Sequence, residues 1–265
     1  MPGAIMPKKK IRKPVAQFTA RITRSIRISY ARPTRPRPAQ RSFFFGDSLT
    51  FGVGLNNPDT LPQVFADLLE RKQRVLNLSF SGYGPQQFLV ELQKGRFDGV
   101  IGPQPRLFIF VTMDAHLERA ACKPFWMRRG PRYTLENGQI ALKGNCYEGW
   151  NLWAREWLEN MASYRLFIEP NLQKFTHEDI ELYIRILLAS AKLAKEKYGV
   201  ETLIPYIHDP RYSNPISKAG FSEDEIVQRL REGGAMVVDV SHTKTDAPTN
   251  SASKATAIQR CWRTV

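Results

Sequence analysis

The chain has 265 residues, of which 42% are hydrophobic and 11% aromatic, so it can bury the core of an ordinary globular protein. Its net charge of +14 would suit a nucleic-acid-binding protein, but the excess lies in one segment. Residues 1–41 hold 12 of the 39 Lys and Arg residues and no acidic residue. Residues 42–265 carry 27 basic and 25 acidic residues, which excludes a uniformly basic domain.

The basic tail, residues 1–41, combines like charge with proline, and both oppose compaction. We expect it to be disordered or to be a targeting segment, because arginines alternate with isoleucines between Phe18 and Tyr30 as in transit peptides. An extension without a role fits equally well. The tail can also contact nucleic acid or an anionic membrane electrostatically. No apolar run reaches the roughly 20 residues of a membrane span, and no clear secretory signal follows Met1.

Short apolar runs bounded by turn residues predict five strands. They span residues 43–45, 74–78, 107–112, 200–207 and 235–240. Helical patterns lie between and after them, over residues 61–69, about 85–97, about 147–162, from 176 onward, 222–231 and about 251–262. This alternation predicts one α/β domain over residues 42–265, a three-layer sandwich around a five-stranded parallel sheet.

Residues 122–148 interrupt the alternation. Segments 132–135 and 139–142 flank a turn at 136–138, which predicts a hairpin inserted over the carboxyl ends of the strands. Three cysteines, Cys122, Cys146 and Cys261, are widely spaced and form no C-x-x-C pair, which argues against a zinc site and a disulfide framework. A single bridge between Cys122 and Cys146 stays open.

Polar residues follow every predicted strand. In chain order they are Asp47 and Ser48, Gly82, Asp114 and His116, His208 and Asp209, and Asp239 and His242. Right-handed crossovers bring all these strand ends to one edge of the sheet. A serine nucleophile, a glycine N–H donor and a histidine beside an aspartate can therefore meet there. Alternatively, Asp47 or Ser48 simply caps the next helix, and Gly82 serves the geometry of a turn.

Two segments carry a resemblance to a known family. Phe45-Gly46-Asp47-Ser48-Leu49-Thr50, and Asn77 with Ser81-Gly82-Tyr83-Gly84, resemble the first two blocks of the SGNH (GDSL-type) hydrolases. These are esterases, lipases and carbohydrate deacetylases on a flavodoxin-like sheet. The resemblance implies that Ser48 is the nucleophile, that the N–H groups of Ser48 and Gly82 hold the oxyanion, and that a small-molecule ester is hydrolysed without a cofactor or metal.

Two later blocks depart from the family pattern. Met113 stands where the family usually supplies an asparagine to the oxyanion hole, and methionine cannot donate a hydrogen bond. The last block is split, since Asp239 and His242 lack the following proline, and Ala247 precedes Pro248 where the histidine would fall. Either His242 is the base, oriented by Asp239, or the base is missing.

The other histidines have plainer interpretations. His177 is expected at the solvated start of a helix, while His116 and His208 can pack, cap or line the cleft together with Asp47 and Asp114. No G-x-S-x-G elbow, phosphate-binding loop or metal-ligand cluster is present in the sequence. The sequence therefore predicts a serine ester hydrolase, with a catalytically degenerate SGNH-like binding module as the alternative.

Overall fold

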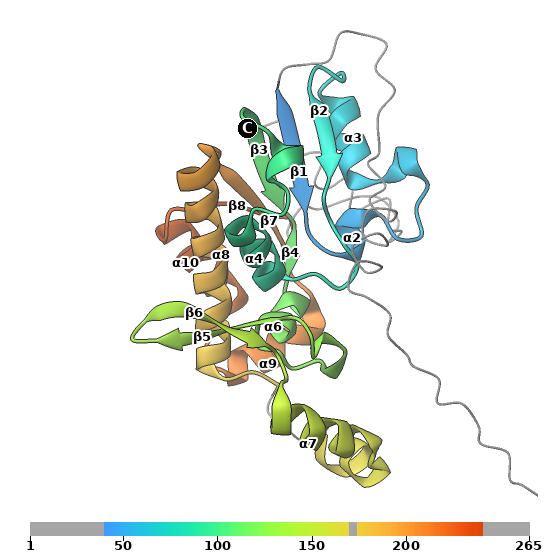
Figure 1. Cartoon of the computed structure of the whole chain (residues 1–265), viewed down its shortest axis with the longest axis vertical. Helices are drawn as coiled ribbons and strands as arrows, with labels where there is room; N and C mark the ends of the chain where they lie inside the picture. The colour runs from blue at the N-terminus through green and yellow to red at the C-terminus, as the bar shows by residue number, and fades with distance from the viewer. Residues whose placement is uncertain (1–39, 170–173, 241–265) are drawn as a thin grey trace, which may run out of the picture.

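A computed structural model describes residues 40–169 and 174–240 of the chain. Its centre is a parallel sheet with strands in the order β2-β1-β3-β7-β8, which is the order of flavodoxin-like folds (Figure 1). The strands are β1 (Arg41–Phe45), β2 (Arg74–Asn77), β3 (Pro105–Phe110), β7 (Thr202–Ile207) and β8 (Met236–Asp239). A short strand, β4 (Thr112–Met113), continues β3 after Val111 and also pairs with β7.

Helices cover both faces of this sheet. The longer helices of the chain are α3 (Leu61–Leu68), α4 (Pro85–Lys94), α7 (Gly149–Asn160), which stands apart from the sheet, α8 (His177–Tyr198), α9 (Pro210–Lys218) and α10 (Glu223–Glu232) (Figure 1). The shorter ones are α2 (Ser48–Phe51), η1 (Asn57–Asp59), α5 (Asp98–Ile101), α6 (Ala115–Ala120), η2 (Phe125–Met127) and η3 (Tyr164–Ile168). None of these helices, within the described ranges, combines the length and hydropathy that crossing a bilayer would require.

The first strand shows why the sheet is buried on both sides. Phe43 and Phe45 join the larger core, where Phe45 lies 4.7 Å from the Phe88 ring of α4. Phe44 points the other way into a smaller core and meets the Phe65 ring of α3 at 5.3 Å. Successive side chains of a strand point to opposite faces, so three consecutive aromatics require an apolar layer on each face.

The α/β fold class expected from the sequence is confirmed, and the five expected strands match β1, β2, β3 with β4, β7 and β8. Helices α8 and α10 begin where the sequence predicts, and each is started by a capping box, at Thr176 and at Ser222. Helices α6 and α9 were not expected. The tail before Gln40 and the expected helix over about 251–262 lie outside the described residues.

The expected hairpin forms from β5 (Pro131–Glu136) and β6 (Gln139–Asn145), and Asn137 and Gly138 adopt the positive φ values of a two-residue turn. It packs against α4 and α8, and the Tyr133 hydroxyl donates to Gln93 of α4 at 2.6 Å. The bridge between Cys122 and Cys146, left open by the sequence, is present and closes the segment that contains this hairpin.

Gly46 is the residue that lets the chain turn from β1 toward Ser48. Its φ is +150°, and a Cβ placed there would lie 2.4 Å from the Oγ1 of Thr50 and 3.2 Å from the carbonyl oxygen of Val111. Thr50 is fully buried, and the Val111 carbonyl belongs to the neighbouring strand path. Neither neighbour can move away cheaply, so this position accommodates only glycine.

We predict that Gly46→Ala lowers the free energy of unfolding by about 3 kcal/mol, because it adds an overpacked methyl group to an unfavourable backbone conformation. Gly54→Ala is the matched control, since Gly54 has a φ of +82° but nothing within 4 Å of the added Cβ. The control should cost about 1 kcal/mol. Urea unfolding of both variants measures the difference, and equal losses would contradict the steric argument.

Candidate active site

Ser48 is the first residue of the short helix α2, immediately beyond the end of β1. The Asp47 side chain caps this helix by accepting a hydrogen bond from the Leu49 N–H at 2.9 Å. Asn77, at the end of β2, donates to the carbonyl oxygens of Thr50 and Phe51 at 3.3 Å and so holds the helix against the sheet. The capping interpretation is therefore correct for Asp47, which leaves the half-buried Ser48 hydroxyl without a hydrogen bond to any described residue.

The loop that carries Gly82 is joined to the loop that carries Ser48. Phe80 N–H donates to the Gly46 carbonyl oxygen at 3.1 Å, so the paths leaving β1 and β2 run together. Neither the Ser48 N–H nor the Gly82 N–H donates a hydrogen bond within the described part of the chain. Two backbone donors on adjoining strand ends are the elements of an oxyanion hole.

A tryptophan lies against Gly82. The Gly82 φ is +83°, and a Cβ built there would approach the Trp126 ring at 3.0 Å. The Trp126 ring is itself exposed, and the guanidinium carbon of Arg119 lies 5.8 Å from the ring centroid. The surface beside Gly82 is therefore formed by the Trp126 ring, and the Arg119 guanidinium lies close to that ring.

Asp47 is buried, and its charge is compensated by two residues of α6. Arg119 Nη1 donates to Asp47 Oδ2 at 3.0 Å, and His116 Nε2 lies 3.3 Å from the same oxygen. Burial by itself would raise the pKa of Asp47, but His116, Arg119 and the Leu49 N–H outweigh it and hold this pKa far below its usual range. Asp47 is therefore an anion at any ordinary pH.

His116 is fully buried, and both of its ring nitrogens face other partners. Nδ1 lies 3.0 Å from the hydroxyl of Thr112, which in turn lies 2.8 Å from the hydroxyl of Tyr183. Burial lowers the pKa of His116 by more than Asp47 raises it, so the ring is neutral near pH 7. With one nitrogen toward Asp47 and the other toward Thr112, His116 positions Asp47 and is not placed to take a proton from Ser48.

Arg119 connects the two loops of the site. The Nη1 atom that donates to Asp47 also donates to the Tyr83 carbonyl oxygen at 2.5 Å. Tyr83 follows Gly82 directly, so one guanidinium fixes the segment before Ser48 and the segment after Gly82. No local pattern in the sequence indicates a role for Arg119, because its partners Asp47 and Tyr83 lie far away along the chain. On helix α6 the spacing of three between His116 and Arg119 places both on one side.

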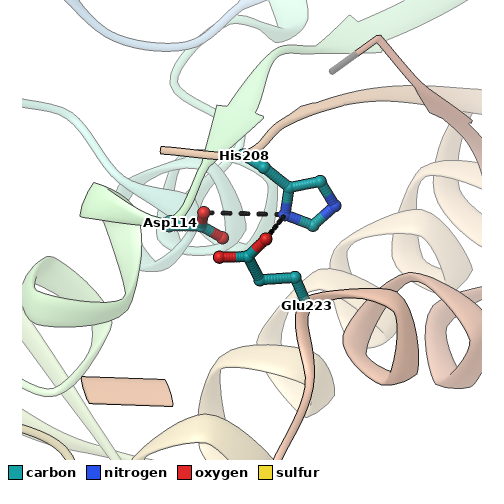
Figure 2. Close-up of side chains that lie close together, drawn as sticks. All are labelled: Asp114, His208 and Glu223. Atoms are coloured by element: carbon teal, nitrogen blue, oxygen red, sulfur yellow. Dashed lines mark ion pairs between the residues drawn. The ribbon is translucent and has the colours of Figure 1, made fainter. Parts of the chain in front are cut away.

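A second polar cluster surrounds His208 at the end of β7. His208 Nδ1 lies 3.6 Å from Asp114 Oδ2 and 3.7 Å from Glu223 Oε2, and Figure 2 shows this nitrogen pointing between the two carboxylates. His208 Nε2 lies 3.6 Å from Asp239 Oδ2. Burial would lower the pKa of His208, but Asp114, Asp239 and Glu223 raise it above its usual value. Carboxylates on both sides favour the protonated form of His208, and a protonated imidazole cannot accept a proton as a general base.

Asp114 is the fixed point of this second cluster. It is fully buried, and its two oxygens accept hydrogen bonds from the Tyr206 hydroxyl at 2.8 Å and the Asp209 N–H at 2.7 Å. Asp209 in turn caps α9 by accepting from the Arg211 N–H. Glu223 belongs to this cluster although the sequence placed it only at the start of a helix, since nothing in its local pattern indicates contact with β7.

Carboxylate and imidazole atoms of this cluster are of the type that binds divalent cations. Asp114, His208 and Glu223 form one group with ligand atoms within 4.8 Å, and His208, Asp224 and Asp239 form another. The two groups use opposite nitrogens of one ring, so they do not surround a common point. A protonated His208 already balances the nearby carboxylates, and the cluster is explained as an ion-pair network.

Of the remaining residues named in the sequence analysis, the structure describes Met113, Asp239 and His177 but not His242 and Ala247. Met113 is half-buried in β4 and packs against the smaller core. Asp239 ends β8 beside His208. His242 and Ala247 lie outside the described residues. His177 is exposed as expected, with its ring 4.6 Å from that of Phe221. The roles expected for Asp239 and His242 stay predictions.

No family model matches the sequence, and no curated protein matches it. Solved structures resemble the chain at low identity. A member of the lipolytic G-D-S-L family from Veillonella parvula is 11% identical, with 85% of this chain and 97% of that one covered and a TM-score of 0.43. A carbohydrate acetylesterase family member from Sinorhizobium meliloti is 13% identical, with coverages of 85% and 98% and a TM-score of 0.40.

The esterase AlinE4, described as an SGNH-hydrolase family esterase, is 14% identical, with 88% of this chain and 97% of that one covered and a TM-score of 0.39.

We predict that His208 stabilises the fold most strongly at low pH. A raised pKa in the folded state means that its stabilisation is complete below the unfolded pKa of about 6.5 and is lost as pH rises through the folded pKa. His208→Gln should cost about 3 kcal/mol near pH 6, because buried carboxylates lose their cation, and less near pH 8.5.

Urea unfolding across this pH range measures the dependence. His177→Gln is the matched control, because His177 is exposed at the start of α8. The loss of unfolding free energy in His177→Gln should be small and independent of pH. A constant difference between the wild type and His208→Gln at all pH values would contradict the ionic role of His208.

Proposed function

We propose that the chain is a serine ester hydrolase of the SGNH/GDSL type that acts on a small-molecule ester through an acyl-enzyme on Ser48. One observation carries the proposal. The Ser48 hydroxyl and the N–H groups of Ser48 and Gly82 have no hydrogen-bond partner among the described residues, although neighbouring residues on α2 and on the Gly82 loop are held by hydrogen bonds. Free groups on a rigid frame are what a nucleophile and an oxyanion hole require.

The base follows by elimination among the four histidines of the sequence. His116 lies between Thr112 and Asp47, His208 lies among carboxylates, and His177 is exposed against Phe221. His242 is the fourth. It follows Asp239, the last residue of β8, by three positions in the sequence. Asp239 has two carboxylate oxygens, so one can face His208 while the other orients His242.

The proposed reaction has two stages, acylation of Ser48 and hydrolysis of the acyl-enzyme. His242 takes the Ser48 proton as Oγ bonds to the ester carbonyl carbon, and the N–H groups of Ser48 and Gly82 hold the oxyanion. Collapse breaks the bond to the alcohol, which leaves with the proton from His242. Water then repeats the sequence, giving up its proton to His242, and its oxygen bonds to the acyl carbon. The bond between the acyl carbon and Oγ then breaks, Oγ takes back the proton from His242, and the carboxylic acid leaves.

Met113 limits the rate expected of this site. It stands where the resembled family supplies a side-chain donor, and its side chain packs with the smaller core. Absence of one oxyanion donor costs on the order of 10²–10³ in rate. The alternative function, an SGNH-like binding module without catalysis, is favoured by Met113 together with Ala247. Both functions use the same residues around Ser48, so they are separated by whether Ser48 reacts.

We predict that a fluorophosphonate probe labels the wild-type chain at Ser48 and that p-nitrophenyl acetate is hydrolysed. Ser48→Ala should abolish both, because it removes the nucleophilic oxygen. His242→Ala should lower kcat by about 10³-fold, since the proton then passes only to water. Intact-mass spectrometry of the labelled protein and initial rates measure the two effects.

His177→Ala is the control for the loss of a histidine away from the site, and its rate should equal that of the wild type. An unlabelled and inactive wild type would favour the binding module. Normal activity in His242→Ala would reject His242 as the base while leaving Ser48 as the nucleophile.

A further inference from the structure

The segment from residue 149 to residue 168, here called the α7–η3 unit, exposes its apolar side chains. No residue of the 12-residue helix α7 is buried. Trp150 is 72% exposed, Trp153 is 56% exposed and Trp157 is 55% exposed. In η3, three consecutive residues, Leu166, Phe167 and Ile168, are exposed as well. Scattered exposed apolar residues are normal, but six large ones on two contacting helices indicate an interaction surface.

The tryptophans share one side of α7. Their spacing of three and four residues puts them on one helix face, and the Trp150 and Trp153 rings stack at 4.7 Å. Helix α7 lies beyond the carboxyl ends of the strands, apart from the helices that cover the sheet (Figure 1). Each of the three tryptophan side chains is more than half exposed, so the domain leaves this face of α7 open to a partner.

Three arginines lie within the α7–η3 unit or close to its start. Arg165 is exposed in η3 next to Leu166. Arg129 is exposed, and Arg128 and Gly130 accept backbone hydrogen bonds from Tyr147 and Cys146, just before α7 begins. Within the described ranges, Arg128, Arg129 and Arg165 form no ion pair with a carboxylate, and the Arg128 guanidinium lies over the Phe125 ring. Their charges are available to an anionic partner.

The acidic residues of the unit are partly neutralised. Arg155 pairs with Glu159 at 2.8 Å and lies 3.4 Å from Glu169. Glu156 is the remaining exposed acid of α7, and it lies to one side of the tryptophan face. The surface thus presents tryptophan, leucine, phenylalanine and isoleucine beside unpaired arginines.

We infer that the α7–η3 unit binds an anionic lipid surface, with its tryptophans at the interface and Arg128, Arg129 and Arg165 on the headgroups. Tryptophan favours the membrane–water boundary because its ring is apolar and its N–H is polar. Unpaired cations beside an apolar helix face add attraction to anionic headgroups. A second copy of the chain would bury the same face, and the experiment distinguishes it from a lipid surface.

The experiment is flotation of the full-length chain with two kinds of vesicle, phosphatidylcholine alone and phosphatidylcholine with an equal amount of phosphatidylglycerol. The wild type should partition to the mixed vesicles, and its tryptophan fluorescence should shift to the blue. Trp150→Ala combined with Trp153→Ala should lower the partition coefficient about tenfold or more, because buried apolar area is lost. Met236→Ala, an exposed apolar residue at the start of β8, should leave it unchanged.

The basic tail carries 12 Lys and Arg residues and no acid, so we expect it to add electrostatic attraction to anionic vesicles. The assay is therefore repeated in about 0.5 M salt, where charges separated by more than a few ångströms are screened. The part of the vesicle binding that depends on the tryptophans should persist at this salt concentration. At low salt, Arg129→Glu should weaken binding about fivefold or more, whereas Arg106→Glu, an exposed arginine at the start of β3, should have no effect.

Two results would overturn the inference. One is equal partition of the wild type and the double tryptophan variant at both salt concentrations. The other is a concentration-dependent dimer in sedimentation velocity that the double variant abolishes, with no vesicle binding by either, which would assign the face to a second copy. Esterase activity plays no part in the readout, so the outcome is independent of the proposed function.

Discussion

The buried carboxylate of Asp47 is the charge on which the site depends. An uncompensated carboxylate at this depth would be strongly unfavourable, so its partners must be held in place for the chain to fold this way. Three groups are the partners of this carboxylate: the Leu49 N–H of α2, and the side chains of His116 and Arg119 of α6. Because Arg119 also binds the Tyr83 carbonyl oxygen, the compensation of one charge sets the positions of both Ser48 and Gly82. The contacts that compensate the buried charge are therefore the same contacts that hold Ser48 and Gly82 in position.

The two polar clusters at the carboxyl edge of the sheet are opposite in sign. Around Asp47 an anion is surrounded by donors, whereas around His208 a ring is surrounded by Asp114, Glu223 and Asp239. The pKa of Asp47 is lowered and that of His208 is raised, so both environments favour the charged form. Each cluster holds strand ends together, the first across β1 and β2, the second across β4, β7 and β8. Ser48 stands beside the first.

The sequence was sufficient for the sheet and for the ends of several helices, because these depend on local pattern. Three consecutive phenylalanines, a capping box at Thr176 and an Asn-Gly turn are each readable without tertiary contacts. Helix α9 was not predictable in the same way. It contains Pro215 in its interior, and it forms because Tyr212 and Ile216 are buried against the core, which a local pattern does not reveal.

The site was predictable at its strand ends and not in its connections. Ser48 and Gly82 lie on adjoining loops as the parallel sheet requires. Arg119 and Glu223 were missed because each acts across more than 70 residues or between separate elements. His116 and His208 were named as cleft residues, but which atoms they face depends on side-chain packing from several elements. Long-range ion pairs carry no periodic signal in the sequence.

The bridge between Cys122 and Cys146 has a consequence for where this chain can work. It closes the segment from which α7 leaves, and Tyr147 adds hydrogen bonds to Arg128 and Cys122. Thiols are kept reduced in the cytosol of most organisms, whereas periplasmic, secreted and endoplasmic-reticulum proteins retain such bonds. In an oxidising compartment the base of α7 is covalently anchored. Under glutathione it would depend on a few hydrogen bonds, so the redox state of the surroundings governs how firmly the tryptophan-bearing arm is attached.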